Sequence, residues 1–170
     1  MKNSIKILAA IAVIGFAGNA SAQGPTANAN ANATVVQPVS LSNNGTALSF
    51  GNVVAVANGS ATMSDAPVGV ETYTAGVDPG NLNRGTQSNV HFTVSGAAGF
   101  LWNIPAPPTT IPVISGANTL TVDNLTFSSI GGTLSGIGVA DFYLGGTLEL
   151  GATPVNGTYA GSVPVTVAYN

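Results

Sequence analysis

The chain has 170 residues, of which 45% are hydrophobic and only 5% are charged, with 22 Gly, 10 Pro and no Cys. This length predicts one domain that is large enough to bury a hydrophobic core. The absence of Cys excludes disulfide frameworks, zinc fingers, iron–sulfur sites and thiol catalysis.

Residues 1–22 have the pattern of a secretory signal peptide. Lys2 and Lys6 flank the start of an apolar stretch from Ile7 to Ala17, and Ala20-Ser21-Ala22 has the small-residue form of a cleavage site. These eleven apolar residues are too few to span a bilayer, so an uncleaved anchor is the less favoured alternative. We therefore expect an exported protein that begins at Gln23 and has no integral membrane span after cleavage.

Cleavage changes the charge of the chain. Arg84 remains as one cation beside six acids, which gives a formal charge of −5. One cation cannot follow a phosphate backbone, so nucleic-acid binding is excluded. A polybasic contact with a membrane surface is excluded for the same reason.

Residues 23–36 form an N-terminal extension with an unusual repeat. Thr26 to Val36 reads TANANANATVV, and a period of two is strand geometry. Ala and Asn are poor strand formers, so the segment should not form a strand by itself. It is either a spacer or a donor strand that completes the groove of a neighbouring subunit by β-augmentation. In the second case, one face carries the donor side chains Ala27, Ala29, Ala31, Ala33 and Val35.

Residues 37–170 have the pattern of an all-β domain. Short alternating apolar runs are separated by Gly, Pro and Asn, including Gly131-Gly132 and Gly145-Gly146, which we interpret as turns. The pattern predicts a single Ig-like or pilin-like antiparallel β-sandwich. The strands should include the runs Val90–Val94, Phe100–Ile104, Leu120–Val122, Phe142–Leu144 and Leu148–Leu150. We expect the core to contain Phe50, Phe92, Phe100, Trp102, Phe127, Phe142 and Tyr159.

The longest apolar stripe lies near the C-terminus and consists of Val163, Val165, Val167 and Tyr169. One interpretation is an acceptor edge that flanks an open groove. The other is an ordinary last strand that completes the sandwich of its own chain.

The sequence contains little that could perform catalysis. His91 is the single His, and no G-x-S-x-G motif accompanies it. We therefore predict that the protein is not an enzyme and has no catalytic, cofactor-binding or metal-binding residues.

Several short motifs resemble one known family in their order along almost the whole mature chain. They are Thr34–Leu41, Ala47–Gly51, Val90–Gly96, Trp102–Pro105, Thr119–Val122, Gly145–Leu150, Gly157–Gly161 and Val165–Asn170. The chain resembles the secreted bacterial family known as domain of unknown function 4402. This resemblance implies export and fold but no activity.

The C-terminal stripe, with its aromatic penultimate residue, is also similar to chaperone–usher pilins, the subunits of fimbriae. In pilins the last strand flanks a groove that a periplasmic chaperone fills first and the next subunit's N-terminal extension fills later. This chain differs from common pilins because it has no disulfide and has Ala where bulky aliphatic residues usually stand.

These features predict a structural subunit of an extracellular pilus- or fimbria-like fibre, assembled non-covalently by donor-strand exchange, with adhesion as a further expected role. Its partners would be other copies of itself, a periplasmic chaperone and an outer-membrane usher. It would pass through the periplasm to the cell surface. The alternative is a monomeric secreted or periplasmic β-sandwich that binds a carbohydrate or a protein. In a fibre subunit, residues 26–36 should not fold fully into the sheet of their own chain.

Overall fold

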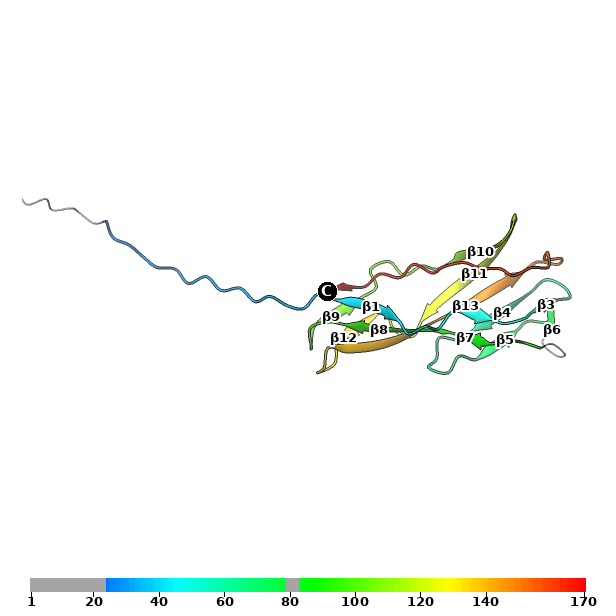
Figure 1. Cartoon of the computed structure of the whole chain (residues 1–170), viewed down its shortest axis with the longest axis horizontal. Coiled ribbons are helices and arrows are strands. Elements are labelled where there is room, and N and C mark those ends of the chain that lie inside the picture. The colour runs from blue at the N-terminus through cyan, green and yellow to red at the C-terminus, as the bar shows by residue number, and fades with distance from the viewer. Residues whose placement is uncertain (1–23, 79–82) are drawn as a thin grey trace, which may run out of the picture. The chain divides into compact units, whose positions relative to one another are not determined.

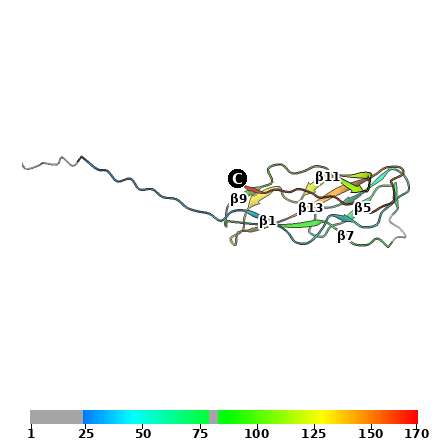
Figure 2. The same ribbon diagram turned by 45° about the horizontal axis from the view of Figure 1, so that its top comes forward.

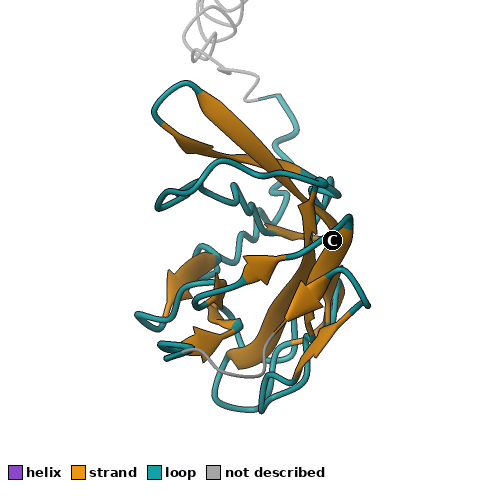
Figure 3. Cartoon of the chain, turned by 90° about the vertical axis from the view of Figure 1, so that its right-hand side faces the viewer, coloured by secondary structure: helices purple, strands orange, loops and turns teal. Residues whose placement is uncertain are grey.

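The computed structural model describes residues 24–78 and 83–170, so the predicted signal peptide lies outside the described residues. In the described ranges the chain forms strands and loops and no helix, which confirms the all-β prediction (Figure 3). It follows that these ranges contain no helix that is long and apolar enough to cross a membrane. Residues Val36–Asn170 form one compact unit, which is called the domain below.

A seven-stranded antiparallel sheet forms the main layer of the domain, and its longest strand, β13, pairs with three others. The alternating apolar residues predicted around positions 90–94 and 120–122 lie in β8 and β11 of this sheet. Its strands are β1 (Ser40–Asn43), β4 (Gly59–Met63), β5 (Glu71–Tyr73), β8 (Val90–Ser95), β10 (Ile111–Ser115), β11 (Asn118–Phe127) and β13 (Val139–Leu150).

Shorter sheets cover the inner face of the main sheet. One has three strands in the order β12 (Gly131–Thr133), β9 (Leu101–Asn103) and β14 (Ala168–Tyr169). Two others are pairs, in which β2 (Ser49–Phe50) joins β7 (Gln87–Ser88) and β3 (Val54–Ala55) joins β6 (Val77–Asp78). Trp102 from β9 stacks on Phe142 from β13, with ring centroids 5.5 Å apart, so the two layers meet through aromatic rings.

The core is organised around Phe142, which is fully buried and has three aromatic neighbours. Of the predicted core residues, Phe50, Phe92, Trp102 and Phe142 are buried, whereas Phe127 and Tyr159 are half-buried. The prediction for Phe100 was wrong, because its side chain is 43% exposed. Phe100 follows the turn at Gly99 and precedes β9, and its ring lies against Tyr169 at the margin of the domain.

The two glycine pairs predicted to be turns lie within strands. Gly131 and Gly132 belong to β12, and Gly145 and Gly146 lie in the middle of β13. A Cβ atom on Gly145 would overlap the carbonyl oxygen of Met63 and the backbone of Ser64. Glycine is therefore present in β13 because the neighbouring backbone passes too close for any side chain.

The C-terminal stripe forms a shorter strand than its pattern predicts. Only Ala168–Tyr169 pairs with β9, and residues 161–167 are assigned to no strand. Continuing this register would bring Thr166 opposite Pro105, which has no N–H to donate. The pairing with β9 therefore ends where its sequence turns to proline.

The domain has two ends, which are named here after residues that lie at them. At the Tyr169 end, the Gly96 N–H donates to the Gly138 carbonyl beside the start of β13, and the Ala97 N–H donates to the Tyr169 hydroxyl. At the Leu150 end, Leu150 pairs with Gly59, and the chain continues into residues 151–157. The twelve residues of β13 span about 36 Å when extended. Figures 1 and 2 show β13 running between the two ends.

Candidate strand-binding groove

An uncharged groove of about 870 Å³, with an apolar floor, lies over the inner face of the main sheet. One wall is residues 46–55, which include β2 and β3, and the other is residues 154–163 of the C-terminal segment. The residues that line the groove include no charged side chain. Its floor is formed by Val90, Phe92, Ile111, Val122, Leu144, Leu148 and Leu150.

The groove is shallow. Each floor side chain is at most 7% exposed, so the floor is already close-packed. Exposed apolar surface comes instead from the walls, where Val54 is 40% and Val155 is 54% exposed. A shallow apolar groove can accept small side chains along its length without reopening the core.

The C-terminal wall has one unpaired backbone edge. In an antiparallel pair, alternate residues direct both backbone groups toward the partner strand, and the residues between them direct theirs away. The Asn170 N–H donates to the Leu101 carbonyl at 3.0 Å, and Ala160 exchanges two hydrogen bonds with Ile114, so even-numbered residues face β9 and β10. The odd-numbered residues between them therefore direct their backbone groups to the other side, which at Val163 is the side of the groove.

Exposure along this wall follows the same alternation. The side chains at odd positions from Val163 to Val167 are half-buried, while Pro164 and Thr166 are exposed. The proline is at an even position, where its missing N–H removes no donor from the edge that faces the groove. The C-terminal wall thus retains its donors and acceptors for an added strand.

The opposite wall is paired on one side only. β2 pairs with β7 and β3 pairs with β6, and each of these pairs is a separate two-stranded sheet among the described residues. The second layer is thus interrupted between residues 46–55 and the C-terminal segment. The groove lies in this interruption, between the two walls.

The residues predicted as the acceptor edge lie along one segment but not all in the groove. Val163 lines the groove. Val165 and Val167 are half-buried against the core further along the segment. Tyr169 belongs to β14, and its hydroxyl donates to the Gln37 carbonyl at 2.7 Å.

Sequence reasoning did not find the wall formed by residues 46–55. Its apolar residues, Leu48, Phe50 and Val53, do not follow a single period of two, and Gly51 has a positive φ of 63°. The interrupted alternation was the available signal. It indicates a segment that bends as it moves from one layer of the sandwich to the other.

The N-terminal extension forms no strand. Residues 24–39 have no assigned secondary structure, and the side chains of residues 24–38 are exposed. Val35 is 96% exposed. The five predicted donor residues, Ala27, Ala29, Ala31, Ala33 and Val35, are therefore exposed and outside any strand.

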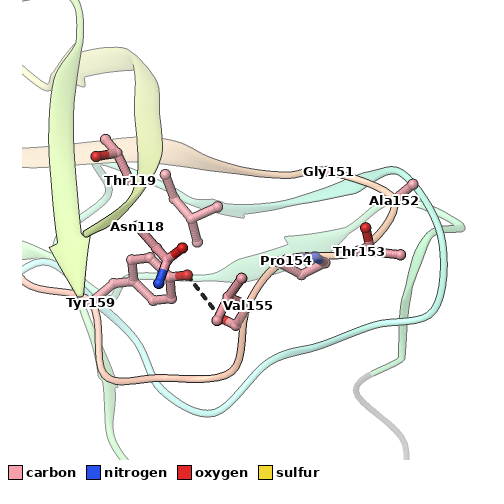
Figure 4. Close-up of a pocket in the computed structure, with 9 residues that line it drawn as sticks. Asn118, Thr119, Gly151, Ala152, Thr153, Pro154, Val155 and Tyr159 are labelled. Carbon is pink, nitrogen blue, oxygen red and sulfur yellow. Dashed lines mark hydrogen bonds between the residues drawn. The ribbon is translucent and has the colours of Figure 1, made fainter. Parts of the chain in front are cut away.

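A smaller pocket of about 310 Å³ adjoins the groove at the Leu150 end (Figure 4). It is lined by residues 118–120, residues 151–155 and Tyr159, and it contains no charged group. The Tyr159 hydroxyl donates to the Val155 carbonyl at 2.8 Å, which fixes the end of the groove wall.

The titratable side chains with partners lie elsewhere. His91 Nε2 lies 3.1 Å from Asp141 Oδ1, and the His91 ring stacks on Tyr143. Arg84 donates to Glu71, whose buried position raises the pKa of its carboxyl while the Arg84 charge opposes that shift. Across residues 24–78 and 83–170, no group of three or more His, Cys, Asp or Glu is arranged to hold a metal ion.

A family model described as "Domain of unknown function (DUF4402)" matches residues 39–169. The chain belongs to the DUF4402 family. The DUF4402 match contains both walls and the whole floor of the groove, but it ends short of the extension. No curated protein and no solved structure gave a significant match to the chain.

Proposed function

We propose that this DUF4402 protein is a non-catalytic structural subunit of a surface fibre that assembles by donor-strand exchange. In this proposal, residues 26–36 of one copy enter the groove of the next copy as the strand that its second layer lacks. The single observation that carries the proposal is the groove with its apolar floor, toward which the C-terminal wall directs unpaired backbone groups at Val163.

The side chains of the extension suit the groove. Ala27 to Val35 span about 30 Å when extended, and one face of this segment carries only Ala and Val side chains. The methyl groups of the Ala residues suit a shallow floor, while the alternating Asn residues would face solvent. Backbone hydrogen bonds would supply much of the affinity, as in other cases of strand addition.

The proposed contact joins two different surfaces of the same protein. A heterologous contact of this kind does not close on itself and produces a filament rather than a dimer. Before exchange, the groove would leave an apolar, unpaired strand edge, which promotes aggregation. A periplasmic chaperone and an outer-membrane usher would protect that edge during export to the cell surface.

The test is polymerisation of the chain that begins at Gln23, followed by negative-stain electron microscopy. We expect filaments from this chain and none after deletion of residues 24–36. A peptide of residues 26–36 should bind the deleted chain and raise its melting temperature, by the equivalent of about 2.7 kcal/mol at 100 times the Kd.

Two matched substitutions sharpen this test. Ala31→Asp places a charge on the face expected to contact the floor and should abolish filaments. Asn30→Asp adds the same charge one residue away, on the solvent face, and should be tolerated. If the deleted chain is indifferent to the peptide and the full chain stays monomeric, the extension is a spacer and a secreted binding module becomes the better interpretation.

A further inference from the structure

The two ends of the domain each expose several large apolar side chains. At the Tyr169 end these include Phe100, 43% exposed, Leu101, 52% exposed, and Ile137, 86% exposed. At the Leu150 end they are Val54, Val56 and Val155, which are 40%, 65% and 54% exposed. Exposed apolar side chains at an end of the domain are available for contact with another copy.

Hydrogen bonds locate these residues at the ends. Ile137 lies in the short turn in which the Gly138 N–H donates to Ser135, and Phe100 packs on Tyr169. At the other end, the Val56 N–H donates to the Gly76 carbonyl at 3.0 Å. Val54 and Val155 both line the mouth of the groove. The labelled strands in Figure 1 show the same separation, with β9 and β12 at one end and β3 and β6 at the other.

The connection between extension and domain decides which ends can meet. The chain enters the domain at the Tyr169 end, where the Gln37 carbonyl accepts a hydrogen bond from Tyr169. The groove lies toward the opposite end, between residues 46–55 and 154–163. Beyond Val163, the side chains of Val165, Val167 and Tyr169 pack against the core, as do Val39 and Leu41, and none of these residues lines the groove.

We infer that consecutive copies pack end to end, with Phe100 and Ile137 of one copy against Val54, Val56 and Val155 of the next. This inference rests on the proposed function. The donor residues join their own domain directly at Val36. When they enter the groove of the next copy from the Leu150 end of that copy, the Tyr169 end of the donor copy comes against the mouth of the groove. The inserted strand then runs antiparallel to the C-terminal wall.

Charge substitutions test this contact. Val56→Asp and Ile137→Asp should each raise the monomer concentration at which filaments form by about tenfold, because an Asp carboxylate would be buried in an apolar contact. Val68→Asp is the matched control. Val68 is 79% exposed, and its neighbour Gly69 lies beside Met63, which pairs with Gly146 in the interior of β13, about 13 Å along the strand from Leu150 and about 23 Å from Val139.

Disulfide cross-linking is a second test, because the chain contains no Cys of its own. Filaments of the Ile137→Cys, Val56→Cys double variant should give a ladder of disulfide-linked oligomers on oxidation. The Val68→Cys, Val56→Cys double variant should give none.

The outcomes separate this inference from the proposed function. Each Asp variant must still bind the peptide of residues 26–36 when its own residues 24–36 are deleted, which shows that its groove is folded. If Val56→Asp and Ile137→Asp leave filament formation unchanged and the Ile137→Cys, Val56→Cys variant gives no ladder, the end-to-end contact is wrong. Strand exchange would remain the proposed mode of assembly. A parent chain that never forms filaments would overturn the proposed function itself.

Discussion

Two regions of the domain have the alternating pattern of a strand, but they differ in how much of their length pairs with other strands. β13 carries Phe142, Leu144, Leu148 and Leu150 and pairs along both edges with β4, β8 and β11. The C-terminal segment alternates just as regularly from Val163 to Tyr169, yet only its last two residues pair in a strand. Alternation therefore marks a chain that can form a strand, and the neighbours decide whether it does.

The difference should appear most strongly in amide hydrogen exchange. The amides of Leu144 and Leu148 should exchange only by global unfolding, which costs about 5 kcal/mol or more in a typical domain. The amides of Val163, Val165 and Val167 should exchange with little protection in the monomer without residues 24–36. Adding the peptide of residues 26–36 should slow amide exchange at Val163. The Leu148 amide should still exchange more slowly than the Val163 amide. Equal protection of both regions before peptide is added would show that the C-terminal edge is already paired.

Removal of the Phe142 ring tests how much β13 contributes to the stability of the domain. Phe142→Ala should lower the free energy of unfolding by about 3–5 kcal/mol, because it leaves a cavity between Phe92, Trp102 and Phe127. Thr121→Ala, an exposed position on the same sheet, is the control and should change stability little. Urea denaturation of both variants measures the difference. A loss below about 1 kcal/mol for Phe142→Ala would place the core elsewhere.

Crowding of the backbone around β13 gives a smaller effect. Gly145→Ala should cost about 1–3 kcal/mol, because its methyl group would press on the backbone of Met63 and Ser64. Gly136→Ala should be nearly neutral, since no atom lies within 4 Å of the new methyl group. Thermal melts of the two variants compare the sites. A stable Gly145→Ala protein would mean that β4 lies further from β13 than in this structure.

The smallest effect concerns Glu71, at the edge of the main sheet in β5. Burial raises the pKa of its carboxyl above 4.5, so the folded state favours the protonated form. The resulting stabilisation is complete below pH 4.5 and is lost as the pH rises through the raised pKa. The melting temperature of the wild type minus that of Glu71→Gln should therefore decrease as the pH increases over this range. A relative melting temperature that rises with pH would show that the Arg84 ion pair outweighs burial.

The sequence by itself determined the fold class and most of the core. Alternation in Val90–Val94 and Phe142–Leu144 identified two central strands, because a half-buried strand needs apolar residues on one face only. The same rule failed for Phe100, since alternation does not show where a strand begins. It also failed for Gly145, because a close approach between distant backbones leaves no local signal.

Only the tertiary structure decided where the groove lies. The sequence identified the C-terminal stripe and the alternating extension, but it left open whether the last strand completes its own sandwich. The wall at residues 46–55 and the end of pairing at Pro105 become visible only when segments distant in sequence are brought together. The physical reason is that an unpaired edge is a property of the space beside a strand, and the residues in that space come from elsewhere in the chain.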